Sequence, residues 1–394
     1  MDSIKLAKEN ESLIIEIRRE LHKIPELELE LPKTVKFVKS KLDEWGISYV
    51  EMVNGNGLVA LIEGAEEGEC LAIRADMDAL PVAEETGLEF ASQHEGRMHA
   101  CGHDSHTAIA LVTAKIINEN KDKIKGAVKF IFQPGEEIPG GAKPMIDEGA
   151  LLNPKVDYFI SLHNGKLADL GHGNIGFREN ELMASMDKFS LKVTGRGGHG
   201  ASPHLAIDPI AISAEIISGI QKIISREIAP VESGLISVCM IKGGSTQNII
   251  PDQVEMLGTA RALNEQTRDL IEKRIEEIAK GIAQSYGGDA ELNYERKYPV
   301  LVNDPEFTQY VKSLTKNLFS DLVVDIPLPT MGSEDAAFYL QEVPGTYIFM
   351  DNIKPHKDGV CYLNHNSKFD LDESDFYKGV AIFLETAFNK LAKK

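Results

Sequence analysis

Residues 98–137, MHACGHDSHTAIALVTAKIINENKDKIKGAVKFIFQPGEE, decide the fold class of this protein. Within this stretch, residues 105–117 (SHTAIALVTAKII) have the length and pattern of a helix, and residues 127–132 (AVKFIF) form a short apolar run typical of a buried strand. Alternation of this kind is typical of α/β proteins. We therefore expect a mostly parallel or mixed sheet with helices on both faces.

The alternation continues on both sides of that stretch. The apolar runs that we interpret as further strands of the same sheet are GLVALIEG (57–64), CLAIRADM (70–77), YFISLH (158–163) and TYIFMD (346–351). The segments that we expect to be helical are 4–23, 32–45, 304–319, 373–391 and one that begins near residue 333. These elements belong to one large α/β domain.

The middle of the chain has a different order of elements. It predicts the strands FSLKVTGR (189–196), LISVCMIK (235–242), QVEMLGTARA (253–262) and AELNYERKY (290–298), with helices over 208–226 and 265–286. The resulting order, βαββαβ, is that of the ferredoxin-like unit, which folds as a compact body. We therefore expect an inserted domain over 184–297, and a discontinuous catalytic domain made of 1–183 and 298–394.

Composition excludes several classes of partner. Of the 394 residues, 43% are hydrophobic, and the net charge is −19, which disfavours binding to nucleic acid or to anionic lipid. No apolar run is long enough for a transmembrane helix, and the first residues, MDSIKLAKENESLII, lack a signal-peptide core. The four scattered cysteines do not form a disulfide framework, so we expect a reducing, cytoplasmic location.

Potential metal ligands lie in four loops that we expect at one edge of the sheet. They are Cys101, His103, Glu137, His163 and His365. Any one of these residues alone would more often be an ordinary structural side chain, but together they indicate a metal site. Thiolate, imidazole and carboxylate suit two divalent ions, zinc or manganese above all, and Glu136 can then take a proton from an attacking water.

Seven motifs now carry a resemblance that spans almost the whole chain. They are RADMDALP (74–81), MHACGHDSHTA (98–108), FIFQPGEE (130–137), GGAKPMIDEGAL (140–151), GRGGHGASPH (195–204), QNIIP (247–251) and LNHNSKF (363–369). In these motifs the chain resembles the di-metal aminoacylase and carboxypeptidase superfamily. It is most similar to the branch of indole-acetyl-amino-acid hydrolases, hippurate hydrolases and bacterial N-acyl-amino-acid amidohydrolases.

The resemblance implies roles for individual residues. The five potential ligands would hold two metal ions per subunit, with Glu136 as the general base. His199 would polarise the substrate carbonyl across a dimer interface, and Asn248 and Arg261 would bind the substrate carboxylate. The resemblance also implies a homodimer, or a higher homo-oligomer, formed through the inserted domain (184–297), which would act as a lid.

Some of these residues allow more than one interpretation. The glycines around His199 form either a plain turn or a loop that approaches a ligand closely. Arg261 lies in a mainly apolar strand and needs an anion, either a structural carboxylate or that of a substrate. Asp78 either orients a metal ligand or caps the turn that follows it, and Asp104 has the same two interpretations as a possible helix N-cap.

The expected activity is hydrolysis of the amide bond of a small N-acyl amino acid or short peptide. The nearest alternative is a metallocarboxypeptidase or dipeptidase that uses the same site, and the alternative from another class is a binding protein without catalysis. Glu136 beside a full ligand set favours an enzyme, because a binding protein has no use for that base. Asn164, Gly165 and Lys166 stand where relatives often have apolar residues and a proline, so the substrate preference of a relative does not transfer directly.

Overall fold

The computed structural model describes residues 1–393 and contains two compact units. The larger unit comprises Met1–Leu182, Val302–Leu328 and the chain from Glu334 onward. The smaller unit comprises Met183–Leu301 and Pro329–Ser333. The chain thus enters the second unit once for a long insertion and again for a short segment.

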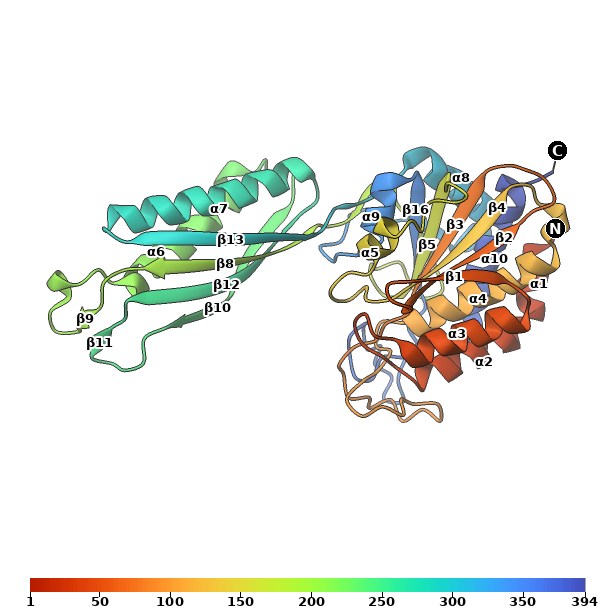
Figure 1. The fold of residues 1–394 in the computed structure, drawn as a ribbon, viewed down its shortest axis with the longest axis horizontal. Helices are drawn as coiled ribbons and strands as arrows, with labels where there is room; N and C mark the ends of the chain where they lie inside the picture. The colour runs from red at the N-terminus through yellow and green to blue at the C-terminus, as the bar shows by residue number, and fades with distance from the viewer. Residues whose placement is uncertain (394) are drawn as a thin grey trace. The chain divides into compact units, whose positions relative to one another are not determined.

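An eight-stranded mixed sheet forms the centre of the larger unit (Figure 1). Its strands, in spatial order, are β1 (Ser48–Met52), β2 (Gly57–Glu63), β4 (Ala127–Gln133), β3 (Cys70–Asp76), β5 (Tyr158–Gly165), β16 (Gly345–Asp351), β6 (Ile175–Phe177) and β15 (Val323–Asp325). Strands β4, β3, β5 and β16 are parallel, whereas β1, β2 and β6 introduce antiparallel pairs. The prediction of an α/β protein with a mixed sheet is therefore confirmed.

Helices cover both faces of this sheet. The helices of the unit are α1 (Ser3–Glu9), α2 (Glu11–His22), α3 (Pro32–Glu44), α4 (His103–Glu119), α5 (Ala142–Asp147), α8 (Pro305–Phe319), α9 (Ala337–Glu342) and α10 (Phe376–Lys390). Ile160 and Leu162 of β5 belong to the main core cluster together with α4 and α10. Phe159 points to the other face, because side chains alternate along a strand, and there it stacks on Tyr339 of α9 at 5.0 Å between ring centroids.

The smaller unit has a four-stranded antiparallel sheet with strand order β10-β12-β8-β13. Its elements follow the chain as β8 (Met186–Thr194), α6 (Pro209–Lys222), β10 (Gly234–Gly243), β12 (Gln253–Ala262), α7 (Glu265–Ser285) and β13 (Asp289–Tyr298). Alternate residues of β8 are buried in a cluster with apolar residues of α6 and α7. Two short pairs complete the fold, β9 (Gly198–His199) with β11 (Ile249–Ile250), and β7 (Asn180–Met183) with β14 (Leu301–Asn303).

The helices differ in detail from the sequence-based expectation. The segment 4–23 is two helices, because Asn10 leaves the helical conformation with ψ near 7°. The expected helix over 208–226 ends at Lys222 and continues as one π-helical turn over Ile223–Glu227. The helix expected to begin near residue 333 begins only at Ala337, and the last helix opens with a 3-10 turn over Glu373–Asp375. Short-range periodicity does not report such changes at helix ends.

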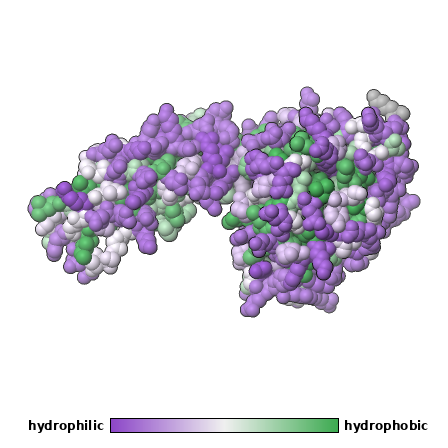
Figure 2. Space-filling model, viewed as in Figure 1, coloured by the Kyte–Doolittle hydropathy of each residue, from purple (hydrophilic) through white to green (hydrophobic). Residues whose placement is uncertain are grey.

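No helix formed by residues 1–393 combines the length and the apolar character needed to cross a bilayer. Hydrophilic residues cover most of the face seen in Figure 2, in keeping with the net charge of −19. All four cysteines are free thiols, two of them buried.

Candidate metal centre

The expected ligands of the larger unit converge at the carboxyl ends of the parallel strands. His163 lies near the end of β5, and Glu137 lies in the loop after β4. Cys101 immediately precedes α4 and His103 begins it, while His365 comes from the long loop after β16. Parallel strands end at the same edge of a sheet, which is where open α/β enzymes place their sites.

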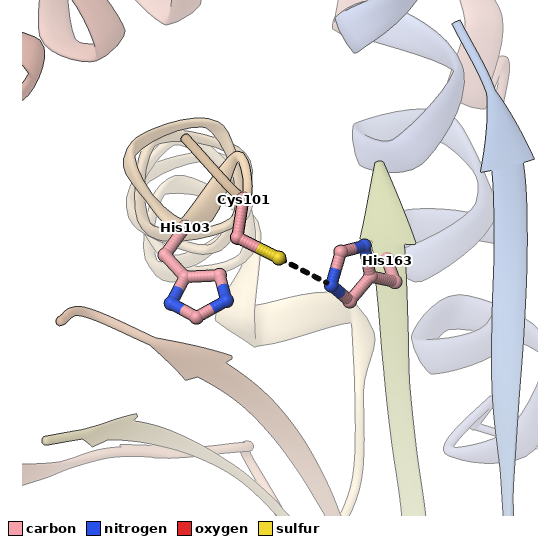
Figure 3. Close-up of side chains that lie close together, drawn as sticks. All are labelled: Cys101, His103 and His163. Carbon is pink, nitrogen blue, oxygen red and sulfur yellow. Dashed lines mark hydrogen bonds between the residues drawn. The ribbon is translucent and has the colours of Figure 1, made fainter. Parts of the chain in front are cut away.

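Two sets of potential ligands share Cys101. Its thiol forms one set with His103 and His163, and a second set with Glu137 and His365, and within each set the ligand atoms all lie within 4.8 Å of one another. The Sγ of Cys101 lies 3.5 Å from Nε2 of His163, as Figure 3 shows, and Nε2 of His365 lies 3.1 Å from Oε1 of Glu137. The thiol therefore stands between two half-sites.

The imidazole rings are oriented by backbone carbonyls. Nδ1 of His103 donates to the carbonyl oxygen of Asp78 at 2.9 Å, and Nδ1 of His163 donates to that of Asn164 at 2.7 Å. A carbonyl can only accept, so Nδ1 carries a proton in both rings, and in the neutral form of each ring Nε2 is the nitrogen that can bind a metal ion. Nε2 of His103 is buried without a hydrogen-bond partner. An orphaned imidazole nitrogen beside a thiol and carboxylates fits a metal ion.

Asp78 holds the turn that carries the two adjacent glutamates. Its carboxylate is fully buried and accepts the backbone N–H groups of Glu136 at 2.9 Å and Glu137 at 3.0 Å. The same carboxylate lies 3.4 Å from Nδ1 of His103. Asp78 thus caps the turn after β4 and not the turn that follows Asp78 itself, and its role in orienting a metal ligand stays a prediction.

The environment of Glu136 is strongly acidic. Glu136 is only 6% exposed, and one of its carboxylate oxygens lies within 4.8 Å of oxygens of Glu334 and Asp335. Burial and the negative charges of Glu334, Glu137 and Asp335 raise the pKa of Glu136 well above its ordinary value. The same excess of negative charge acts on the nearby imidazole, since hydrogen bonds to Cys101 and Glu137 raise the pKa of His365 to about 10.

A buried network behind the centre was missed by sequence reasoning. Arg74 of β3 donates to Asp76 at 2.6 Å, to Glu334 at 2.9 Å and to Asp335 at 2.8 Å. Asp76 also lies 2.6 Å from Nδ1 of His106, whose Nε2 accepts the backbone N–H of Asn164. The one available signal was an arginine inside an apolar strand, because a buried guanidinium needs anionic partners.

Asp104 is not the N-cap of α4, because Gly102 occupies that position with φ +92°. The buried carboxylate of Asp104 instead accepts from Arg18 at 2.9 Å and lies 2.6 Å from Nδ1 of His22. Burial opposes its ionisation, but Arg18 and His22 outweigh that effect and hold the pKa of Asp104 well below its usual range. This ion pair ties α2 to the first turn of α4, beside His103.

The remaining predicted residues lie in the smaller unit. His199 and Asn248 are neighbours there, because β9 pairs with β11 and the N–H of Gly200 donates to the carbonyl of Asn248 at 2.9 Å. His199 is exposed, and its Nδ1 accepts the N–H of Ala201. Arg261 lies elsewhere in this unit, on β12, where it is half-buried and donates to the hydroxyl of Ser333 at 3.0 Å.

Arg261 is paired with a hydroxyl and not with a carboxylate in the part of the chain that the structure describes. Among residues 1–393, no carboxylate oxygen lies within ion-pairing distance of its guanidinium, since the nearby Asp187 pairs with Arg268 instead. Burial lowers the pKa of Arg261, which is the direction expected for a cation without a close anion. Both interpretations of this residue, a structural carboxylate or that of a substrate as its partner, stay predictions, and within residues 1–393 its guanidinium makes its side-chain hydrogen bond to Ser333.

Comparisons with known proteins define the class of the chain. It is 41% identical over 370 residues to thermostable carboxypeptidase 1 of Saccharolobus solfataricus, a match that covers 93% of this chain and 92% of that protein. It is 38% identical over 375 residues to N-acetylcysteine deacetylase of Bacillus subtilis, covering 95% and 96%. The class is thus that of hydrolases of amide bonds.

Within this class the family can be stated. The model of peptidase family M20/M25/M40 matches residues 72–389, and the chain belongs to this family. A crystal structure of the Bacillus subtilis YXEP protein, a dinuclear metal-binding peptidase of family M20, has a TM-score of 0.84 and 35% sequence identity, and covers 98% of this chain and 99% of that one. The resemblance seen in the motifs is confirmed.

Proposed function

We propose that this protein is a two-metal amidohydrolase that cleaves N-acyl amino acids to a carboxylic acid and a free amino acid. The observation that carries the proposal is the pair of ligand sets that share Cys101. His103 and His163 would form one half-site and Glu137 and His365 the other, and Cys101 would contribute to both. Two divalent ions, zinc or manganese, would polarise the amide carbonyl and lower the pKa of a water molecule.

Glu136 is the proposed general base. It would take the proton of the attacking water and pass it to the nitrogen that leaves when the amide bond breaks. Its carboxylate stands beside the ligand sets without being needed in either, and Asp78 fixes the backbone that carries it. His199 is proposed to polarise the substrate carbonyl.

Arg261 and Asn248 are proposed to bind the carboxylate of the amino-acid part of the substrate. The half-buried guanidinium of Arg261, without an anion of its own, supports this role, because a bound carboxylate would supply the missing charge. Both an N-acyl amino acid and a peptide with a free carboxyl end carry that group.

The smaller unit, given by residues 184–297 in our sequence-based division, is proposed to be a ferredoxin-like lid and dimerisation domain. Its element order and its strand order β10-β12-β8-β13 support the fold assignment. Homodimerisation, or assembly into a higher homo-oligomer, through this unit remains a proposal, as does a cytoplasmic location, which the four free thiols support.

A substrate panel with metal analysis tests the proposed function. N-acetyl and N-benzoyl amino acids are to be compared with dipeptides, using enzyme reconstituted with zinc or manganese. We expect the highest kcat/KM for N-acyl amino acids and close to two metal equivalents per subunit. A clear preference for dipeptides would favour the carboxypeptidase or dipeptidase alternative, to which the relative from Saccharolobus solfataricus points. One equivalent or none after reconstitution would exclude the two-metal site.

A further inference from the structure

The side chain of Asn364, the residue before His365, reaches toward the shared cysteine. Its amide nitrogen lies 3.3 Å from the carbonyl oxygen of Cys101 and 3.7 Å from the Sγ of Cys101. It also lies 3.5 Å from the carbonyl oxygen of Asn164, and its Oδ1 accepts the N–H of Lys166 at 3.0 Å. One amide thus joins the loop of His365 to the loop of Cys101 and to the end of β5.

Gly165 leaves the space that this amide occupies. A Cβ at Gly165 would lie 2.4 Å from Nδ2 and 2.5 Å from Oδ1 of Asn364, well inside any ordinary contact. Gly165 also has φ +119°, a conformation that other residues rarely adopt. The absence of a side chain at Gly165 therefore leaves room for the amide of Asn364, and any side chain at residue 165 would displace that amide.

The carbonyl of Asn164 links Asn364 to the first half-site. This oxygen accepts Nδ1 of His163 as well as the amide of Asn364. The segment around it is held firmly, because Asn352 donates to Oδ1 of Asn164 at 3.0 Å and accepts the N–H of Gly165 at 2.9 Å, and both asparagines are buried. Of these three asparagines, Asn364 is the one whose side chain also reaches the thiol of Cys101.

We infer that Asn364 is a positioning residue for the thiol of Cys101 that the two half-sites share: it holds the Sγ in place and donates a hydrogen bond to that sulfur. The inference rests on the proposed two-metal function. The 3.7 Å contact joins the amide to a sulfur that becomes negatively charged when it binds metal, and hydrogen bonds to ionised acceptors are the strong ones. Partners that orient metal ligands in this way commonly contribute 10- to 100-fold to metal affinity or activity.

Cobalt is a suitable probe, because a cobalt–thiolate pair has a charge-transfer band that reports directly on the sulfur. The full-length protein is freed of metal and titrated with Co²⁺, against a competing chromophoric chelator. Asn364→Ser removes the amide, and Asn366→Ser is the matched control, since the hydrogen bond that its side chain accepts comes from the N–H of Lys368 in the same loop. Thermal unfolding of the metal-free proteins checks that each variant is folded.

We expect Asn364→Ser to weaken the binding of cobalt by about 10- to 100-fold and to shift the thiolate band, while Asn366→Ser behaves as wild type. Gly165→Ala should give the same spectral shift, because its Cβ would displace the amide of Asn364. In the Asn364→Ser background that amide is absent, so Gly165→Ala should lower the affinity for cobalt by a smaller factor there. Wild-type affinity and an unchanged band in Asn364→Ser would overturn the inference, as would equal losses in both serine variants. If Asn364→Ser does not fold, Gly165→Ala decides the question by the same two readouts.

The wild-type titration separates this inference from the proposed function. Two bound cobalt ions with a thiolate band support the hypothesis that Cys101 is a ligand in a two-metal site. The variants then test the role of Asn364 alone. If the wild-type protein binds fewer than two ions, or shows no thiolate band, the proposed function itself fails, and the inference fails with it.

Discussion

Replacement of Glu136 and of Glu137 by glutamine, one at a time, separates two neighbouring carboxylates with different proposed roles. Glu137 belongs to the ligand set with Cys101 and His365, whereas both sets that share the cysteine are complete without Glu136. Glu137→Gln should therefore lower metal content together with activity. Glu136→Gln should keep two metal equivalents and lose rate.

The size of the rate loss follows from the role of a general base. Such a group typically contributes 10²–10⁴ to the rate, or about 2.7–5.4 kcal/mol of activation free energy, and more if it serves in both proton transfers. Glu136→Gln should not destabilise the fold, because burial and the neighbouring carboxylates of Glu334 and Asp335 already disfavour the charged form of this side chain, and glutamine is neutral and of similar size. Substrate binding should persist, since Arg261 and the ligand sets are unchanged.

The assay combines kcat on an N-acyl amino acid with elemental analysis of the same samples. Wild-type protein treated in parallel is the control for metal loss during purification. The reasoning would be refuted by the reverse pattern, in which Glu136→Gln loses metal and Glu137→Gln stays loaded but inactive. Full activity and full metal content in both variants would remove this pair from catalysis altogether.

Four further outcomes are expected. Cys101→Ser should lose both metal and activity. Iodoacetamide should inactivate the metal-free wild-type protein but not the metal-loaded one. If Cys101→Ser keeps its metal and its activity, the thiol is not a ligand. The pKa of His365 is raised to about 10 without metal, so metal binding should release the proton of this side chain. The affinity for metal should therefore rise by up to tenfold per pH unit below that pKa. Calorimetry in buffers of different ionisation enthalpy measures the proton release. Arg261→Met should raise KM for carboxylate substrates at unchanged metal content, and an unchanged KM would contradict its role. Arg18→Met leaves only His22 beside the buried carboxylate of Asp104 and should lower the free energy of unfolding in urea by about 3–5 kcal/mol, against Arg19→Met as the control on the exposed neighbour.

The sequence by itself determined which residues stand at the ends of strands. Apolar runs such as CLAIRADM and AVKFIF are recognisable as buried strands, because nearly continuous apolar sequence is typical of strands that are covered on both faces. Parallel strands bring their carboxyl ends to one edge of the sheet. Candidate ligands at or just beyond the ends of such runs, such as His163 and Glu137, can therefore be found from local pattern. The composition and the motifs likewise sufficed to recognise the class of enzyme.

Only the tertiary structure showed that these candidate ligands group into two sets around one cysteine. That Cys101 is shared, that the carbonyls of Asp78 and Asn164 orient two imidazoles, and that Asn364 reaches the thiol depend on contacts between loops far apart in the chain. Local periodicity reports which face of an element is buried, but not which distant group it meets there. The break at Asn10 and the pairing of Arg18 with Asp104 escaped the sequence for the same reason, because the packing of neighbouring elements sets them.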